Sequence, residues 1–241
     1  METIRKINYY KESLIELEKI KNSGIKPSIA LHACCGPCSA YPIEFLVGYF
    51  SKVTILFDNS NIYPFEEYSR RKDELIRYVN IFNDEHNTNV EVVVFDYDNE
   101  SYNEMLDEYG DMDEGLSRCF KCYSTRMENC YKYAEENGYD YFCTVMTISR
   151  QKSSQVMNKI GIDLSKKYKT KYFLSDFKKN KGIDRAREIR IEYNMYNQQY
   201  CGCIYSYNRY LKRKEKENLW YIVERFIWLI CAWFMMKMEI F

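Results

Sequence analysis

Seven of the ten cysteines in this chain of 241 residues lie in three short groups. Within each group, neighbouring cysteines are separated by at most two residues. The groups are Cys34, Cys35 and Cys38, then Cys119 and Cys122, then Cys201 and Cys203. Clustered thiols bind metal ions, hold iron–sulfur clusters or carry out redox chemistry. The other three cysteines, Cys130, Cys143 and Cys231, stand alone, and we expect them to be small buried apolar residues.

The first group, in HACCGPCSA, follows a predicted strand over 28–33 and opens a predicted helix. Ligands of open α/β sheets bind beyond the carboxyl ends of strands, and a helix N-terminus also stabilises thiolates. The CGPC segment matches the thioredoxin redox motif as well. That fold needs only about half of this length and leaves Cys34 and the second CxxC pair without a role. The position of the group is therefore typical of an active site.

The two CxxC pairs, Cys35/Cys38 and Cys119/Cys122, suggest four thiolate ligands for one metal centre. Some 80 residues separate the pairs, whereas a compact zinc ribbon has roughly 15 to 20. Four thiolates also hold a 4Fe-4S cluster, but this spacing is not that of a ferredoxin. The pattern favours an enzyme that uses its cluster on a substrate over a simple electron carrier.

The third group, Cys201 and Cys203 in YCGCIY, has a single residue between its two thiols. Two such cysteines form a strained disulfide or ligate one metal together, and strained disulfides are the labile, catalytic kind. Either role places this pair next to redox chemistry.

Alternating strands and helices must position these groups. Buried β-type runs lie at 28–33, 53–58, 90–95, 141–146 and 171–174. Helical periodicity is found over 3–23, 39–50, 64–82, 117–137, 153–160 and 183–195, and again after 206. The alternation predicts an α/β fold, a parallel sheet with crossover helices.

Composition excludes several classes of protein. The chain is 46% hydrophobic and 17% aromatic with only 9 Gly and 4 Pro, so it is neither disordered nor collagen-like. Its 35 Lys and Arg balance 35 Asp and Glu, but the charges are segregated. Residues 84–114 hold 12 Asp and Glu and no Lys or Arg, and 166–190 hold 10 Lys and Arg and three Asp and Glu. A basic face of this kind attracts polyanions even when the net charge is zero.

The two ends of the chain indicate a cytoplasmic location. The first residues are charged from Glu2 onward and lack the pattern of a secretory signal, so a structural disulfide framework is not expected. Near the other end, the longest uncharged run, 226–236, has 11 residues, fewer than the roughly 18 needed to span a bilayer. We expect no stable membrane insertion, and we expect this apolar tail to dock on a protein surface.

Six segments, taken together, resemble the signatures of the QueH-type epoxyqueuosine reductases over roughly residues 28–207. In chain order they are LHACCGPCSAYPIEFL, NSNIYPFEEYSRRKDEL, EGLSRCFKCYSTRM, TVMTISRQKS, SDFKK and YNQQYCGCIYS. The chain departs from the family's pattern at Arg150 and Gln151, where Pro-His is expected, and at 58–60, where Tyr-Asn-Pro is expected. None of these positions is a proposed ligand.

The resemblance implies a nucleotide-hydrolase-like, Rossmann-like fold, and the helical periodicity outside the matched segments adds helices at both ends. We expect an N-terminal helix over 1–27, an iron–sulfur catalytic domain over 28–207 and a C-terminal helical extension over 208–241. The implied reaction reduces the epoxide of epoxyqueuosine at the wobble position of tRNA to queuosine. The implied partners are therefore this tRNA and an electron donor that the sequence does not identify.

The resemblance also implies the roles of the cysteines. Four of them would ligate a 4Fe-4S cluster: Cys34, Cys35, Cys119 and Cys122. An additional mononuclear iron would lie beside the cluster, with Cys38 as a ligand of this second iron. Cys201 and Cys203 would be catalytic, as a redox-active disulfide or as shared metal ligands.

With tRNA as the substrate, the basic run near residue 178 becomes a candidate RNA-binding surface. We expect Lys178, Lys179 and Lys181 to contact RNA phosphates. Two alternatives remain for the whole protein: a tRNA sulfur-transferase-like enzyme of related fold, and a non-catalytic metal-binding protein. The sulfur transferases bind ATP through a Ser-Gly-Gly-x-Asp-Ser loop, and HACCGPCSA occupies that place here.

Overall fold

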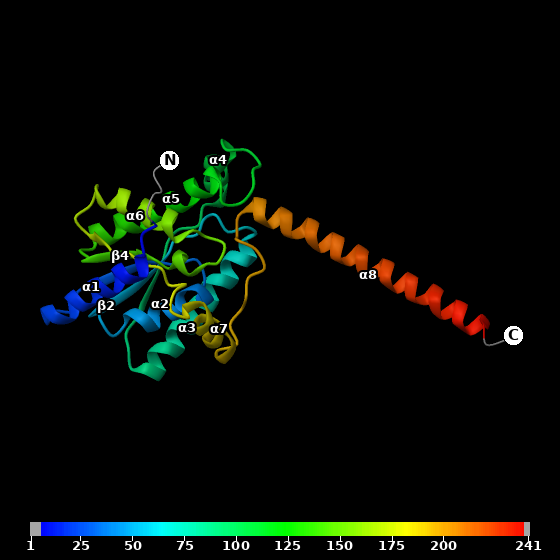
Figure 1. The fold of residues 1–241 in the computed structure, drawn as a ribbon. Helices are drawn as coiled ribbons and strands as arrows, with labels where there is room; N and C mark the ends of the chain where they lie inside the picture. The colour runs from blue at the N-terminus through cyan, green and yellow to red at the C-terminus, as the bar shows by residue number, and fades with distance from the viewer. Residues whose placement is uncertain (1–5, 239–241) are drawn as a thin grey trace.

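A five-stranded, entirely parallel sheet forms the centre of the molecule (Figure 1). The computed structural model describes the backbone of residues 6–238 and, within the last helix, side chains as far as Tyr221 together with Glu224 and Arg225. The strands are β1 (Ser28–His32), β2 (Lys52–Phe57), β3 (Glu91–Val94), β4 (Tyr141–Thr144) and β5 (Lys171–Tyr172). Their order in the sheet is β3-β2-β1-β4-β5. The predicted α/β class with parallel strands is confirmed.

Helices cover both faces of this sheet. They are α1 (Tyr9–Ser23), α2 (Gly36–Leu46), α3 (Phe65–His86), α4 (Asn99–Asp107), α5 (Ser117–Glu136), α6 (Ser154–Ser165), α7 (Gly182–Glu192) and α8 (Ile204–Met238). A short 3-10 helix, η1 (Val145–Ile148), follows β4 directly. Helices α2, α3 and α7 pack together on one face, and α5 and α6 pack together on the other.

The central strand β1 shows why the two faces are both apolar. Its side chains alternate, with Ile29 and Leu31 packing in the core beneath α2 and α3 and Ala30 packing beneath α5. All three are fully buried. Strands covered on both faces need continuous apolar sequence, which the SIALHA run supplies. Burying one leucine side chain in this way contributes about 1.5–3 kcal/mol to stability.

The strand order creates a crevice at one edge of the sheet. The chain proceeds outward from β1 through β2 to β3, and then returns to place β4 on the other side of β1. The connections that leave the carboxyl ends of β1 and β4 therefore diverge to opposite faces, which is where open α/β sheets bind ligands. The residues that follow β1 are those of the first cysteine group.

The structure differs from the expected elements in three places. Helix α4 lies in the acidic stretch, where its only buried residues, Tyr102 and Leu106, give too short an apolar pattern to be recognised. Strand β4 ends at Thr144, whose hydroxyl accepts a hydrogen bond from the Met146 amide and so caps η1. Strand β5 has only two residues.

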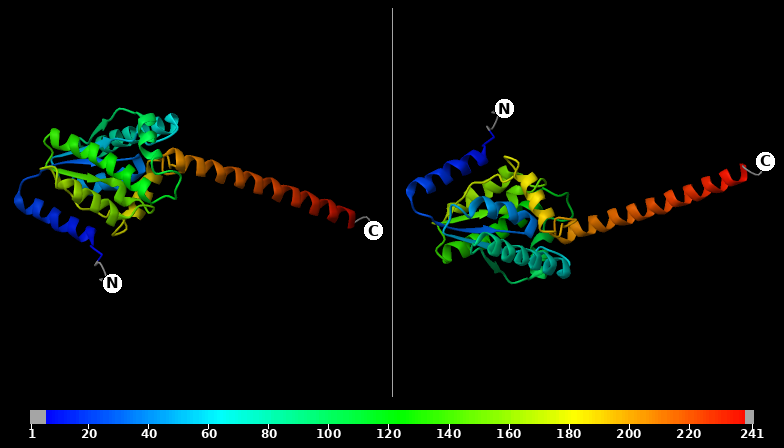
Figure 2. Two further views of the ribbon diagram at one scale, coloured as in Figure 1. Left: turned by 90° about the horizontal axis from the view of Figure 1, so that it is seen from above. Right: turned by 90° about the horizontal axis from the view of Figure 1, so that it is seen from below.

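The last helix, α8, is continuous from Ile204 to Met238 and projects away from the sheet and its covering helices (Figures 1 and 2). The expected boundary between residues 207 and 208 therefore lies inside this helix. Within residues 6–238, no helix is long and apolar enough to cross a membrane. The expected docking of the apolar tail concerns side chains in 226–236, which lie outside the described ones.

Candidate metal and redox centre

The three thiols of the first cysteine group converge at the start of α2. The Sγ atoms of Cys34, Cys35 and Cys38 all lie within 4.8 Å of one another. The helix begins here because Gly36 and Pro37 occupy its first turn, where proline's missing N–H needs no partner. Cys35 is its N-cap residue, and Ser39 Oγ donates a hydrogen bond to the Cys35 carbonyl at 2.8 Å.

These thiols compete for negative charge when no cation lies between them. Hydrogen bonds from the thiols of Cys35 and Cys38 hold the pKa of Cys34 well below its ordinary value. The bond that Cys35 shares with Cys34 raises the pKa of Cys35 to about 12, and the pKa of Cys38 is raised as well. A bound metal cation would remove this competition, because metals bind the deprotonated form of each thiol.

The second group lies on the first turns of α5. Cys119 and Cys122 are both buried, and the Cys122 carbonyl accepts a hydrogen bond from the Tyr102 hydroxyl at 2.9 Å. Burial raises the pKa of the Cys122 thiol, Arg126 and the Tyr102 hydroxyl oppose this rise, and the thiols of Cys201 and Cys119 add to it by smaller amounts. The second and third groups therefore lie within electrostatic range of each other.

The third group is held in place by a buried arginine of α3. Arg71 donates to the carbonyls of Cys201 at 2.9 Å and Tyr200 at 3.0 Å, and it pairs with Glu67 at 2.7 Å. Gly202 has a φ of 136°, and a Cβ there would lie 3.2 Å from the Arg71 guanidinium. Only glycine accepts both constraints without strain, which explains the CGC sequence.

Arg126 is a buried cation without an anionic side-chain partner among the described residues. Its guanidinium is bonded to Asn59 Oδ1 at 3.0 Å, Met146 Sδ at 3.2 Å and the Cys122 carbonyl at 3.5 Å. Burial alone would lower its pKa, but the facing Cys122 thiol, Tyr102 and the Cys34 thiol raise it overall. A buried charge is costly unless it is compensated. Negative charge on the cysteine centre would provide this compensation.

Lys152, which follows η1, adds a second positive charge to the centre. Its burial favours the neutral amine, but the thiols of Cys201 and Cys34 raise its pKa overall. Burial likewise opposes the charge on Arg71, and the Cys35 thiol and the Glu67 carboxylate raise its pKa overall. Cationic groups therefore approach the cysteines from α3, α5 and the loop after η1.

Gln198, just before the CGC segment, contacts the first cysteine group directly. Its Nε2 amide donates to Cys35 Sγ at 3.1 Å and lies 3.9 Å from Cys38 Sγ. Its other amide atom, Oε1, is buried and has no partner among the described residues. No pattern in the sequence points to this residue, because glutamine alone carries no metal-binding signal.

A cavity of about 540 Å³ opens onto this centre. Thiols from the first and third groups line it, together with aromatic, amide and basic side chains. The lining includes Cys34, Cys38, Tyr123, Lys152, Cys201 and Tyr210. Its size suits one nucleoside, and its walls offer both stacking surfaces and hydrogen-bond donors.

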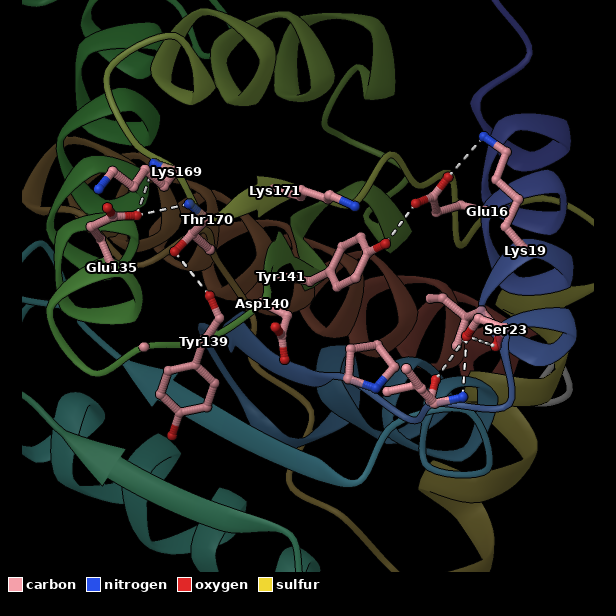
Figure 3. Close-up of a pocket in the computed structure, with 14 residues that line it drawn as sticks. Glu16, Lys19, Ser23, Glu135, Tyr139, Asp140, Tyr141, Lys169, Thr170 and Lys171 are labelled. Carbon is pink, nitrogen blue, oxygen red and sulfur yellow. Dashed lines mark hydrogen bonds and ion pairs between the residues drawn. The ribbon is translucent and has the colours of Figure 1, made fainter.

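A larger cavity of about 700 Å³ lies elsewhere, beside α1 (Figure 3). Its lining residues Pro27 and Asp140 precede β1 and β4, so it is at the amino end of the sheet, opposite the cysteines. Its polar groups are bonded to one another: Tyr141 donates to Glu16 at 2.6 Å, and Lys19 pairs with Glu16 at 3.1 Å. This cavity contains no cysteine and no redox group.

The remaining predicted residues have varied environments. Lys178 Nζ donates to the carbonyls of Thr147 at 2.7 Å and Lys152 at 3.1 Å, which occupies it inside the protein. Lys179 and Lys181 are exposed. The assignment of these three lysines to RNA stays a prediction. Cys130 and Cys143 are fully buried, as expected of isolated cysteines, and the expectation for Cys231 lies outside the described side chains.

The residues at this centre fit a metal cofactor bound by sulfur. The nine described cysteines are free thiols, and soft thiolates favour iron–sulfur clusters, zinc or copper(I). The clustered Sγ atoms, the buried Arg126 and the amide donor of Gln198 together favour an anionic sulfur-ligated group. The number of irons and the ligand set stay predictions.

Comparison with known proteins gives one consistent answer. The family described as epoxyqueuosine reductase QueH matches residues 29–209. The chain is 39% identical over 204 residues to the epoxyqueuosine reductase QueH of Staphylococcus epidermidis, covering 84% of this chain and 85% of that one. It is 40% identical over 202 residues to the protein of the same name from Streptococcus pyogenes, covering 84% and 79%. The chain therefore belongs to the epoxyqueuosine reductase QueH family.

Proposed function

We propose that this protein reduces the epoxide of epoxyqueuosine in tRNA and leaves queuosine. The observation that carries the proposal is the cavity lined by Cys34, Cys38 and Cys201, in a chain of this family. Converting the epoxide to an alkene consumes two electrons and two protons and releases water. Among the described residues, no ATP-type Gly-rich loop follows β1, so this reaction is favoured over sulfur transfer.

The cofactor of this reaction is a 4Fe-4S cluster, with an additional mononuclear iron beside it. Cys34, Cys35, Cys119 and Cys122 would hold the cluster, which supplies electrons one at a time when bound. Cys38 would ligate the second iron. The pair Cys201 and Cys203 would share that iron or act as a redox dithiol.

The protein's own groups position the epoxide and stabilise the charge that develops on its oxygen. Lys152 remains protonated beside the thiols, so its Nζ can donate a hydrogen bond to that oxygen and polarise the C–O bond. Tyr123 and Tyr210 line the same cavity and offer faces on which a base can stack. The target nucleoside must leave its stack to reach the thiols, as in other enzymes that modify bases.

An anaerobic turnover assay tests the proposal. The substrate is tRNA isolated with epoxyqueuosine in place of queuosine, and dithionite serves as electron donor because the cellular donor is unidentified. We expect the nucleosides released after reaction to include queuosine, with the mass of one oxygen atom lost. Protein from which the iron has been removed is the control. Protein with full iron content that leaves epoxyqueuosine unchanged would contradict the proposal.

The reaction belongs in the cytoplasm, where tRNA is available.

Iron and sulfide analysis distinguishes the proposed reductase from a non-catalytic metal-binding protein. Zinc as the bound metal, without sulfide, would favour the latter.

A further inference from the structure

Three arginines line a third cavity, of about 300 Å³, beside the cysteine cavity. Arg150 comes from the loop after η1, and Arg187 and Arg190 come from α7. On α7, Ile183 and Ala186 line the same cavity. Their spacing places all four α7 residues on one face of that helix.

This arginine cavity and the cysteine cavity are neighbours. Cys38, Ser149 and Gln198 line both of them. A group bound by the arginines would therefore lie next to whatever occupies the cysteine cavity. Because α7 packs against α2, which carries Cys38, the two binding surfaces are fixed relative to each other.

The three guanidinium groups have no anionic partner within the described part of the chain. None of Arg150, Arg187 and Arg190 forms an ion pair or a side-chain hydrogen bond there. Arg185, on the same helix, pairs with Glu44 at 2.6 Å and Glu188 at 3.3 Å. Unlike Arg185, the three arginines at the cavity therefore keep their hydrogen-bond donors free among the described residues.

Free guanidinium groups that converge on one pocket favour an anion with several oxygens. Each guanidinium presents a planar fork of donors that matches the geometry of phosphate and carboxylate. A cavity of about 300 Å³ is large enough to admit such a group. The position of this cavity beside the cysteine cavity favours phosphate over carboxylate as the anion. A nucleotide whose base enters the cysteine cavity has a phosphate on each side of its sugar.

We propose that Arg150, Arg187 and Arg190 bind the RNA backbone phosphate that flanks the target nucleoside. This inference rests on the proposed function, since it takes tRNA as the substrate. It assigns the main phosphate contact to α7 and the η1 loop, and not to the Lys178–Lys181 run. Lys178 is already bonded to two carbonyls, which fits this assignment.

Binding of an anticodon stem-loop RNA by the iron-loaded protein tests the inference without turnover. The RNA carries a fluorescent label, and affinity is measured at several salt concentrations for Arg150→Ala, Arg187→Ala and Arg190→Ala. We expect each variant to bind about tenfold more weakly, as for loss of a charge-assisted hydrogen bond. The salt slope should fall by about 0.7–0.9 for each phosphate that the variant no longer neutralises. Arg185→Ala is the matched control on the same helix and should keep the wild-type slope.

A second RNA locates the phosphate. In this RNA an uncharged methylphosphonate replaces the single phosphate on one side of the wobble nucleotide, and a third RNA carries it on the other side. We expect one of the two to bind wild-type protein more weakly, and Arg187→Ala to add no further loss with that RNA. If Arg187→Ala weakens binding of both methylphosphonate RNAs as much as it weakens binding of the unmodified RNA, the contact is overturned. The arginine and the phosphate would then act independently.

Two further results would overturn the inference. One is wild-type affinity and salt slope in all three arginine variants, with losses in Lys179→Ala and Lys181→Ala instead. The other is arginine-dependent binding of inorganic phosphate with no change in RNA affinity, which would make the site one for a free anion. In both cases wild-type protein that reduces tRNA leaves the proposed function standing. Wild-type protein that neither binds nor reduces tRNA contradicts the proposed function itself.

Discussion

The Nε2 amide of Gln198 lies 3.1 Å from the Sγ of Cys35. The two residues are 163 positions apart, and their contact joins the segment before α8 to the loop after β1. The same amide lies 3.9 Å from Cys38 Sγ. A hydrogen-bond donor is therefore held against two sulfurs of the candidate centre.

Replacing Gln198 with Leu should make the proposed 4Fe-4S cluster harder to reduce. Hydrogen bonds to ligand sulfur stabilise the reduced, more negative state, so their loss lowers the reduction potential. We expect a negative shift on the order of 60 mV, which for one electron is a tenfold change in the equilibrium. Redox titration followed by EPR measures it. Gln199→Leu, whose amide donates to the Asn197 carbonyl instead, is the control. An unchanged potential in Gln198→Leu would show that the amide does not act on the cluster.

Replacing Arg126 with Met should weaken cofactor binding more than replacing it with Lys. Met removes the buried positive charge beside Cys122, and Lys keeps it. We expect Arg126→Met to lose most of its iron and Arg126→Lys to keep it with a lower yield. Iron content per chain is the measurement, with thermal unfolding to compare stability. Arg118→Lys is a useful reference, because Arg118 is equally buried but donates to the Gly110 and Met112 carbonyls.

If Arg126→Met retains full iron, the reduction potential of this variant distinguishes charge compensation by Arg126 from a role in packing. A retained cluster with a wild-type potential would mean that Arg126 serves packing alone. A more negative potential would support charge compensation, since removing a nearby cation disfavours the more negative reduced state.

Replacing any one of the four predicted cluster ligands with Ala should abolish most of the iron–sulfur absorption. The four are Cys34, Cys35, Cys119 and Cys122, and each supplies one thiolate. Cys130→Ala and Cys143→Ala are controls, because both side chains are fully buried away from the cavity. A ligand variant that keeps the complete visible and EPR signal would have to be removed from the set. Cys38→Ala should keep the cluster signal and lose only the additional iron.

How much of this centre could be predicted depended on the range of the interactions involved. The position of Cys34 after β1 followed from local sequence, because a buried apolar run and a Gly-Pro helix start lie side by side in HACCGPCSA. The position of Cys201 depends on Arg71, 130 residues away, which donates to its carbonyl. No local pattern encodes a contact between a side chain and a distant backbone group.

The basic residues show the same limit. The charge run predicts that Lys178 contacts RNA, and it does not reveal that Lys178 Nζ donates a hydrogen bond to the Thr147 carbonyl of η1. The three arginines of the arginine cavity come from two separate segments. Their convergence depends on how α7 packs against α2, which composition does not reveal.

Replacing Cys201 and Cys203 together with Ser should stop reduction of epoxyqueuosine and leave most of the cluster in place. The pair lies before α8, outside the first cysteine group, so its loss should not remove the predicted cluster ligands. Nucleoside analysis after anaerobic reaction measures turnover, and iron and sulfide content measures the cofactor. Normal turnover in the double variant would make the CGC segment a structural loop held by Arg71.

Replacing Lys152 with Gln should lower the rate of reduction by about 100-fold, the usual effect of removing one donor that stabilises a developing oxyanion. The Nζ group lies beside thiols that keep it protonated, and the side chain lines the cysteine cavity. Because the charge on the epoxide oxygen grows as the C–O bond breaks, the loss should fall on kcat rather than on KM.

Lys152→Arg keeps a charged donor and should recover part of the rate. Lys159→Gln, exposed on α6 and outside this cavity, is the charge-matched control for turnover. A wild-type kcat in Lys152→Gln would mean that the proton and the hydrogen bond to the oxygen come from another group, for which Tyr123 on the same wall is the next candidate to replace with Phe.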